Sequence, residues 1–501
     1  MRISHSRRAA AVATATTLAL IALGAGAGYA ADEPESTPVP ITTPDGALFS
    51  YVVNTEDSGT RETALAIKAI EQADGVVVQA WPQIGVVVAH SAKGSFRQDV
   101  LAADRVGVIE SVGATRTVSP TEGTPGADTA AGAQQSKSVV GQSRKDVAGG
   151  AVDGPSGASG SDTDPDEVTQ WDMAMIEADK SLEVNPGSAD VVVGVLDSGI
   201  DAAHPDLATQ VDADRSVNCT DGGRPDMSAT GWLPTTSDHG THVAGTIAAA
   251  QNGTGIVGVA PGVTMASVKV VNDDGFIYPE YAICGFVWAG MQHMDVTNNS
   301  YYVDPFMYWC DDQPDQHAGK EAVRRAVDFA TKRGVVHAVA AGNAATDLAN
   351  NTTDATSPND SAAVERVLNS GCEDLPTELD GVVSVSSLTQ TTDLSSFSNR
   401  GLGKIDVAAP GSSILSTTLD GTWGLKSGTS MAAPHVAGVL ALLSSAHPRW
   451  SPAQLEAAVR TQADDHECTA TTAGPACVGG LAENSFYGDG IANALDAVTR
   501  E

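Results

Sequence analysis

The most informative run in the chain is Gly428-Thr429-Ser430-Met431-Ala432-Ala433-Pro434-His435. It sets a serine hydroxyl where a glycine turn meets a predicted buried helix, since residues 436–443 are apolar. Pro434 falls in the first turn of that helix, where no intrahelical hydrogen bond is lost. The positive end and open N–H groups of such a helix can stabilise an oxyanion. A lone serine at a helix start is more commonly an N-cap, so other motifs must decide its role.

A second motif ends a valine-rich apolar run at residues 191–196 with Asp197, Ser198 and Gly199. The run predicts a fully buried, parallel strand. Asp197 would then lie at the carboxyl edge of a sheet, where open α/β folds build their sites. An ordinary Asp-Ser-Gly turn is the alternative interpretation.

The third motif is Ser237-Asp238-His239-Gly240-Thr241-His242-Val243-Ala244-Gly245-Thr246, which opens a helix of small residues. His239 and His242 could be metal ligands, but no third ligand follows at the spacing of zinc peptidases. An acid, a histidine and a serine, in this chain order, instead form a complete set for nucleophilic catalysis.

Together the three motifs resemble the active-site signatures of subtilisin-like serine proteases, over most of residues 170–501. The resemblance implies that Ser430 is the nucleophile, His239 its general base and later acid, and Asp197 the carboxylate that orients the imidazole. It implies an α/β catalytic domain at residues 168–501, with a doubly wound, mostly parallel sheet and helices on both faces. No cofactor is expected for catalysis.

Each of these residue types has a physical reason to be there. A serine hydroxyl is too weak an acid to attack an amide at neutral pH unless a base takes its proton. Histidine is the base whose ordinary pKa lies near that pH. The imidazolium that forms needs a fixed, buried negative partner.

A fourth residue, Asn343, ends a predicted buried strand that closes in Ala340-Ala341-Gly342. A left-handed turn asparagine is the alternative. In the family, an asparagine at this place donates its side-chain amide to the tetrahedral oxyanion, and Asn343 matches it.

The same resemblance implies two edges that bind an extended substrate. Gly275, Phe276 and Ile277 are expected to offer main-chain hydrogen bonds by strand addition. Tyr301 and Tyr302 stand where many relatives carry leucine and glycine, and would narrow or reshape the specificity pocket, unless they are core aromatic residues. The expected substrate-binding residues are Gly275, Phe276, Ile277, Ser300, Tyr301, Tyr302 and Ala340.

A structural calcium site is implied as well, because residues 250–256 occupy the place of the calcium-binding loop of many subtilisin-like enzymes. Calcium takes roughly six to eight oxygen ligands. An ordinary glycine-rich surface turn is the alternative. The expected ligands are the side chains of Gln170, Asp206 and Asn252 and the carbonyls of Ala250, Thr254 and Ile256.

The N-terminus predicts export. Arg2, Arg7 and Arg8 precede an apolar, alanine-rich run, which is typical of a signal peptide at residues 1–30. Sec and twin-arginine export both remain open. No later apolar span reaches about 20 residues, so no membrane anchor is expected. We therefore expect a secreted, extracellular protein.

Residues 31–114 predict a separate small domain. Strands at 48–54, 76–81, 86–90 and 106–112, with helices at 62–73 and 95–104, give the β-α-β-β-α-β order of a ferredoxin-like fold. Ahead of a subtilisin-like domain this order resembles the inhibitory propeptide that assists folding and blocks the cleft. An independent binding module is the alternative.

The segment 115–167 is rich in Gly, Ser, Ala, Thr and Asp, and it predicts a disordered linker suited to cleavage. The cleavage position is left open.

Composition restricts the partners. A net charge of −34 argues against nucleic acid. Six cysteines in an exported chain predict disulfides, of which only the local pair Cys468–Cys477 can be chosen by proximity. The expected partners are protein or peptide substrates and the chain's own propeptide, without nucleic acid or membrane, and a monomer is expected.

The sequence therefore predicts a secreted serine endopeptidase made as an autoprocessed zymogen. An inactive, peptide-binding relative is disfavoured because no catalytic position is substituted. An esterase of another serine class is disfavoured because the chain has no Gly-x-Ser-x-Gly elbow and its acid precedes the histidine.

Overall fold

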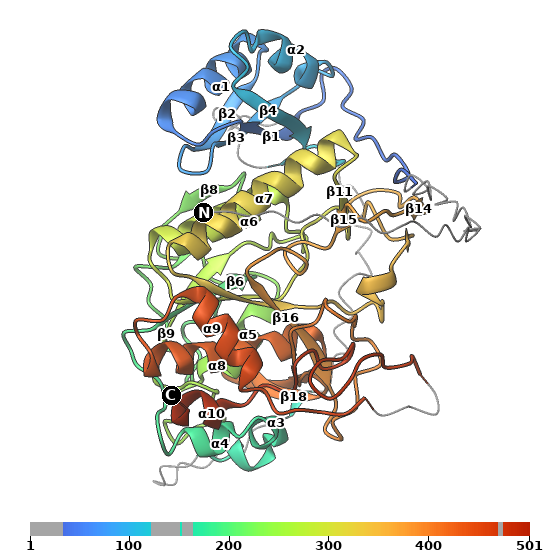
Figure 1. Cartoon of the computed structure of the whole chain (residues 1–501). Coiled ribbons are helices and arrows are strands. Elements are labelled where there is room, and N and C mark those ends of the chain that lie inside the picture. The colour runs from blue at the N-terminus through green and yellow to red at the C-terminus, as the bar shows by residue number, and fades with distance from the viewer. Residues whose placement is uncertain (1–33, 122–150, 153–163, 469–473, 501) are drawn as a thin grey trace, which may run out of the picture. The chain divides into compact units, whose positions relative to one another are not determined.

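The computed structural model describes residues 34–121, 151–152, 164–468 and 474–500, so the predicted signal peptide lies outside the described residues. The larger domain is built on an eight-stranded sheet in the order β17-β16-β12-β10-β6-β9-β7-β8 (Figure 1). All neighbouring strands run parallel except β7 and β8, which confirms the predicted fold class. The strands are β6 (Val192–Asp197), β7 (Val217–Asp221), β8 (Arg224–Asp226), β9 (Thr264–Lys269), β10 (Val296–Asn299), β12 (Val336–Ala340), β16 (Val382–Leu388) and β17 (Val407–Pro410).

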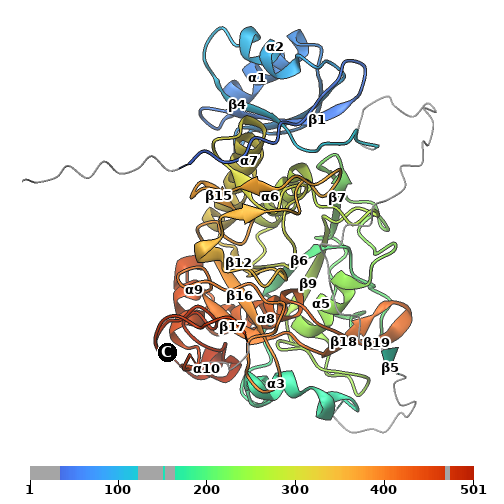
Figure 2. The ribbon, with the colours of Figure 1, turned by 90° about the vertical axis from the view of Figure 1, so that its right-hand side faces the viewer.

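Helices cover both faces of this sheet (Figure 2). Val193 and Val195 of β6 belong to the apolar core that contains α5 and α8, whereas Val192 and Leu196 belong to the core that contains α6. Because successive strand side chains point to opposite faces, these two cores lie on opposite sides. The helices of these two cores include α5 (His239–Ala248), α6 (Pro279–Met291), α7 (Pro314–Lys332) and α8 (Thr429–Ala446).

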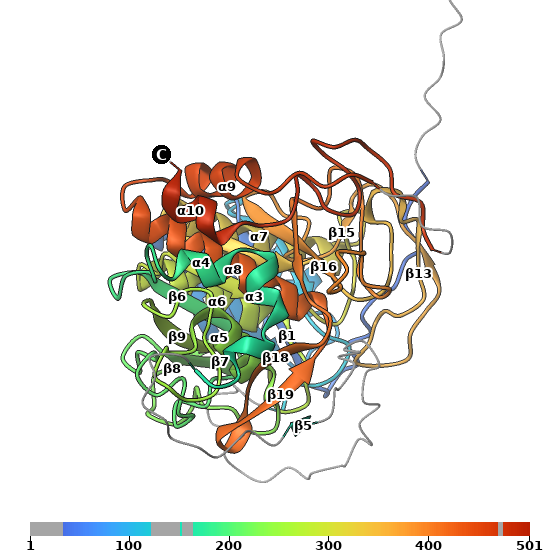
Figure 3. The same cartoon turned by 90° about the horizontal axis from the view of Figure 1, so that it is seen from below.

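The shorter elements complete the larger domain. Helices α4 and α10 pack against each other, and α10 packs against α8 (Figure 3). The short helices are α3 (Trp171–Met175), α4 (Ala178–Ser181), α9 (Pro452–Thr461), α10 (Ala494–Thr499) and the 3-10 turns Glu167–Thr169, Leu348–Asn350 and Leu419–Gly421. The minor strands are β5 (Ala151–Val152), β11 (Trp309–Cys310), β13 (Thr353–Asp354), β14 (Arg366–Val367), β15 (Cys372–Glu373), β18 (Ile414–Thr418) and β19 (Thr422–Lys426).

The strand order changes direction between β6 and β10, which are neighbours in the sheet. After β6 the chain forms β7, β8 and β9 on one side of it, and it then forms β10, β12, β16 and β17 in order on the other side. At such a switch point a crevice opens beyond the carboxyl ends of the strands. Asp197 is the last residue of β6, and Ser300 directly follows β10.

Residues 35–121 contain a four-stranded antiparallel sheet in the order β2-β3-β1-β4. The elements follow the predicted β-α-β-β-α-β order. Strand β4 begins later than the predicted residue 106, because the Asp104 carboxylate accepts the N–H groups of Val106, Gly107 and Ile109 in a turn. The elements are β1 (Phe49–Thr55), α1 (Thr60–Gln72), β2 (Val76–Trp81), β3 (Val86–Ser91), α2 (Phe96–Ala103) and β4 (Ile109–Ala114).

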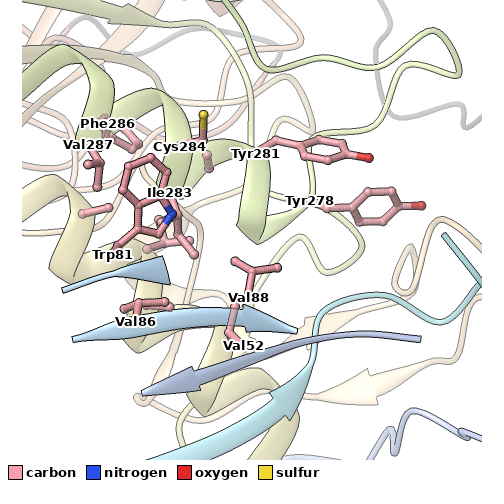
Figure 4. Packing of buried hydrophobic residues seen from close by; sticks show 14 of the residues in the cluster. Val52, Trp81, Val86, Val88, Tyr278, Tyr281, Ile283, Cys284, Phe286 and Val287 are labelled. Atoms are coloured by element: carbon pink, nitrogen blue, oxygen red, sulfur yellow. The ribbon is translucent and has the colours of Figure 1, made fainter. Parts of the chain in front are cut away.

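The small sheet shares one continuous apolar core with α6 and α7. Val52, Trp81 and Val88 of the sheet lie near Ile283 and Val287 of α6 (Figure 4). Polar contacts reinforce the packing on α7. The Asp315 carboxylate accepts the Ala114 N–H at 2.8 Å and also pairs with Arg97.

The predicted disorder of residues 115–167 is wrong at both ends of that segment. Arg116 is 2% exposed, and Asp164 is buried with its Oδ1 accepting the N–H groups of Asn252 and Thr254. Strand β5 adds to the β18–β19 hairpin. Charged side chains with specific partners anchor these ends, and a composition poor in large apolar residues does not reveal such anchors. Residues 122–150 and 153–163 lie outside the described residues.

Three disulfides crosslink the larger domain. Cys219–Cys284 joins β7 to α6, and Cys310–Cys372 joins β11 to β15. The third, Cys468–Cys477, confirms the predicted local pair.

One helix in the described part of the chain, α8, is long and apolar enough to cross a membrane. It is 89% buried inside the fold, where it packs against β10, β12, β16 and β17. The buried core helix of a globular protein can be equally long and apolar.

Acid should destabilise this fold through His337 in β12. Its ring is fully buried between Thr297 and Thr331, and burial lowers its pKa from 6.5 to about 3. The unfolded chain therefore binds the proton more tightly, so the stabilisation is complete above pH 6.5 and is lost as the pH falls. At pH 5 the loss would be about 2 kcal/mol.

We expect His337→Gln to flatten the fall in unfolding free energy between pH 6.5 and 5, measured by urea denaturation. His293→Asn, in an exposed turn, is the matched control and should keep the wild-type slope. An unchanged slope in His337→Gln would contradict the prediction.

Candidate active site

The centre of the site is a buried pair between Asp197 and His239. The His239 Nδ1 lies 2.8 Å from Oδ1 and 2.9 Å from Oδ2 of Asp197, and the two residues are 4% and 1% exposed. The Ser198 N–H donates to Asp197 Oδ1 at 2.7 Å and fixes the carboxylate. This geometry sets the imidazole orientation, because Nδ1 must carry the proton that the carboxylate accepts.

Gly240 allows this pair to form. A Cβ at that position would lie 2.5 Å from the Gly199 carbonyl oxygen and 3.1 Å from the Asp197 Cβ. The Ser198 hydroxyl accepts the Gly240 N–H at 3.0 Å, so the first turn of α5 rests directly on the end of β6. Any larger residue would separate the helix from the strand.

Ser430 is the second residue of α8 and is 6% exposed. The Ser300 hydroxyl donates to the Ser430 carbonyl at 3.0 Å, and Ser430 Oγ donates to the Ser300 carbonyl at 3.4 Å. The latter bond is long, so the hydroxyl can turn to another acceptor at little cost. Helices α5 and α8 pack together, and their first turns carry His239 and Ser430 at one edge of the sheet.

Asn343 is held against the start of α8. Its Oδ1 accepts the N–H of Thr429 at 2.8 Å and the hydroxyl of Thr429 at 3.0 Å. Because the carboxamide oxygen is occupied, the amide nitrogen is the group available to donate to a ligand. The sequence did not predict that Thr429 orients the Asn343 carboxamide. The only signal for this role was that Thr429 directly precedes Ser430.

The predicted edge Gly275–Ile277 is only partly open. Gly275 is exposed with φ +90° and Phe276 is half-buried. Ile277 is buried, its N–H donates to Asp304 Oδ2 at 2.5 Å and its carbonyl accepts the Asp304 N–H at 2.7 Å. Phe276 is occupied in the same way, because its N–H donates to Asn272 Oδ1 at 2.9 Å and its carbonyl accepts the Asn272 N–H at 3.0 Å. The prediction that Phe276 and Ile277 offer main-chain groups to a ligand is therefore corrected, because Asn272 and Asp304 already occupy these groups.

Tyr301 also differs from its predicted place in a specificity pocket. Its ring is buried, its hydroxyl donates to Asn299 Oδ1 at 3.1 Å, and burial followed by the Asp197 charge raises its pKa. Tyr301 is thus a core residue beneath the site. Tyr302 is half-buried, with its hydroxyl accepting from Asn359 Nδ2 at 2.8 Å. Ala340 is buried, and its carbonyl accepts from Thr377.

The predicted calcium ligands gather around one loop, with Asp206 at its centre. The Asp206 Oδ2 accepts from Trp423 Nε1 at 2.8 Å and from the Ile256 N–H at 3.2 Å. Its Oδ1 is buried without a hydrogen-bond partner among the described residues. Burial raises the Asp206 pKa to about 6, and the nearby Asp164 charge adds to the rise.

Two predicted ligands have other partners. The Val257 N–H donates to Gln170 Oε1 at 3.0 Å, and the Thr254 N–H donates to Asn252 Oδ1 at 2.9 Å. These oxygens hold the loop itself, which differs from the predicted ligand role.

The sequence analysis missed Asp164, whose Oδ2 is buried and has no hydrogen-bond partner in the described part of the chain. Two buried carboxylates with open oxygens suit a hard cation. Within the described residues, no group of three or more His, Cys, Asp or Glu side chains is arranged to hold a metal ion.

These contacts define a serine-hydrolase type of centre, with an acid, an imidazole, a hydroxyl at a helix start and an amide donor at the switch point of an α/β sheet. The subtilase family model matches residues 188–490. The chain belongs to the subtilase family of serine proteases.

Curated relatives support this assignment. Subtilisin E of Bacillus subtilis (strain 168) is 36% identical over 310 residues, which cover 62% of this chain and 66% of the relative. Subtilisin DY of Bacillus licheniformis is 32% identical over 327 residues, which cover 65% of this chain and 97% of the relative.

Two solved structures share the fold. The epidermin leader peptide processing serine protease of Staphylococcus aureus aligns with a TM-score of 0.63 at 21% identity, over 90% of this chain and 98% of that one. Fervidolysin of Fervidobacterium pennivorans aligns with a TM-score of 0.60 at 24% identity, over 94% of this chain and 64% of that one.

Asn343→Ala should lower kcat by about 10²- to 10³-fold with little change in KM, because an oxyanion donor acts mainly on the transition state. Steady-state kinetics on a chromogenic peptide would measure both constants. Asn350→Ala, in an exposed turn, is the control and should leave both unchanged. A rise in KM as large as the fall in kcat would contradict the role.

Proposed function

We propose that the chain is a secreted serine endopeptidase, made as an autoprocessed zymogen, that hydrolyses protein substrates through an acyl-enzyme on Ser430. The observation that carries this proposal is the pairing of His239 Nδ1 with both carboxylate oxygens of Asp197, beside the helix start that bears Ser430. Family membership gives the class of reaction.

The chemistry proceeds in two halves. The Ser430 Oγ attacks the scissile carbonyl carbon while His239 takes the hydroxyl proton and Asp197 stabilises the imidazolium. The Asn343 amide and the backbone N–H groups at the start of α8 stabilise the oxyanion. His239 then gives its proton to the leaving amine, and a water molecule repeats the sequence to release the acyl group.

The substrate lies between two edges in this proposal. Gly275 and Phe276 form one edge, and Ser300 and Tyr302 form the other. Strand addition at the edge of Ser300 and Tyr302 would present the scissile bond to Ser430.

The small domain acts as the propeptide inhibitor in this proposal. Its strand β4 runs into Arg116 and Thr117, which are held by partners on the larger domain. A chain segment seated there competes with substrate until it is removed. The signal peptide at residues 1–30 directs export, and we propose a monomer that needs neither membrane nor nucleic acid.

Self-cleavage tests the function. The full-length precursor should convert to a shorter form, whereas its Ser430→Ala counterpart stays intact, because loss of the nucleophile costs on the order of 10⁶ in turnover. Gel electrophoresis with N-terminal sequencing of the product would follow the conversion. Intact bands for both precursors would favour an inactive, peptide-binding relative.

A structural calcium ion is the second part of the proposal. Asp206 and Asp164 would supply carboxylate ligands, and the carbonyls of Ala250, Thr254 and Ile256 remain proposed ligands. The support is that both carboxylates are buried with an open oxygen among the described residues. The ion would neutralise two charges that burial destabilises.

Chelation should therefore lower the thermal midpoint of the processed enzyme, followed by scanning calorimetry, and calcium should restore it. Asp206→Asn should abolish the response to chelator, while Asp328→Asn on the outer surface of α7 should retain it. A midpoint that chelator leaves unmoved would contradict the calcium site.

A further inference from the structure

Arg116 has an unusual environment for a residue of a cleavable segment. It lies two residues beyond β4, is 2% exposed, and its Nη2 donates to Glu280 Oε1 and to the Tyr281 hydroxyl. The guanidinium carbon lies 3.8 Å from the centre of the Tyr278 ring and 5.3 Å from that of Tyr281. The guanidinium is thus bound at its edge by a carboxylate and over its face by an aromatic ring.

This pocket belongs to the larger domain and adjoins the proposed substrate edge. Tyr278 directly follows Ile277, and the rings of Tyr278 and Tyr281 extend side by side from the start of α6 (Figure 4). One residue further along the tail, the Thr117 N–H donates to Asp360 Oδ2 at 2.9 Å. Asn359, next to Asp360, donates to the Tyr302 hydroxyl and to Asp304. The tail therefore contacts residues that adjoin each of the two proposed substrate edges.

Glu280 depends on the small domain for its partners. It is fully buried, and its Oε1 accepts from the Ser50 hydroxyl at 2.8 Å as well as from Arg116. Both donors come from residues 35–121. Within residues 164–468 and 474–500, no lysine or arginine pairs with Glu280.

Release of the small domain would leave this carboxylate without a cation. A carboxylate in partly apolar surroundings is destabilised unless another hydrogen-bond donor or cation binds to it. Water can replace the Ser50 hydroxyl, but an incoming guanidinium would restore both the ion pair and the ring stacking. A substrate arginine therefore gains an interaction here that a neutral side chain does not.

We propose that Glu280, Tyr278 and Tyr281 form a subsite that selects an arginine side chain on the N-terminal side of the scissile bond. The inference rests on the proposed peptidase function and specifies its substrate class. Arginine is favoured over lysine because a planar guanidinium can stack on Tyr278 while its edge donates to Glu280 and Tyr281. Phe276, stacked on Tyr278 at 5.6 Å, extends the aromatic wall.

The first test uses the processed enzyme obtained from the full-length chain. Internally quenched peptides carry arginine, its neutral isostere citrulline, or lysine at each position from the second to the sixth residue before the cleaved bond. We expect kcat/KM to be at least about tenfold higher for arginine than for citrulline at one position, with lysine between them. Equal values for arginine and citrulline at every position would overturn the inference. This test requires no variant to fold.

The second test assigns the preference to the pocket. Glu280→Gln should reduce the ratio of kcat/KM for arginine over citrulline to near one, and Tyr278→Leu should reduce the advantage of arginine over lysine. Asp328→Asn removes a surface carboxylate that pairs with Arg324 and Lys332, and it should keep the wild-type ratios. An arginine preference that survives Glu280→Gln would overturn the subsite.

Failure of the inference and failure of the proposed function give different results. An enzyme that cuts all the peptides without regard to arginine contradicts the subsite and leaves the peptidase function intact. An enzyme that cuts none of them contradicts both.

Discussion

The close approach of α5 to the end of β6 is the constraint on which the site depends. Both carboxylate oxygens of Asp197 can approach the Nδ1 of His239 only because Gly240 carries no side chain where helix and strand meet. The strand places the acid at the sheet edge, and the helix start places the base. A shift of about 1 Å between the two elements would lose the pairing geometry.

Ser430, the proposed nucleophile, depends on a second set of contacts at the same edge. Ser300, at the end of β10, exchanges hydrogen bonds with Ser430, while Thr429 binds the Asn343 carboxamide that follows β12. Two neighbouring parallel strands thus hold the start of α8 from both sides. Because β6 pairs with β10, one sheet positions both the Asp197–His239 pair and Ser430.

The sequence was sufficient for the fold, because strand ends and helix starts are local features with strong apolar flanks. The four proposed catalytic residues lie at or just beyond such strand ends and helix starts. It was insufficient where a role depends on distant partners. An aromatic residue at position 301 predicts the wall of a pocket, but Tyr301 is buried beneath the site. Asp304, which lies in a different loop, is hydrogen-bonded to the main-chain N–H and carbonyl of Ile277. Arg116 lies in a segment whose composition indicates disorder, yet a carboxylate far along the chain orders it. Pairings of this kind have no signal in local pattern or composition.

The small domain and the larger one meet through both apolar packing and charge. Val52 and Trp81 pack toward α6, and two carboxylates of the larger domain, Glu280 and Asp315, receive their cations from Arg116 and Arg97. In a chain of net charge −34, basic side chains from the small domain meet acidic ones on the larger domain, which favours correct docking over alternative contacts. The shared apolar core favours binding of the small domain to the larger one. The buried Arg116–Glu280 pair fixes which residue of the tail lies at the start of α6. A side chain that fixes the position of the proposed propeptide in this way is the one that the proposed subsite would select in a substrate.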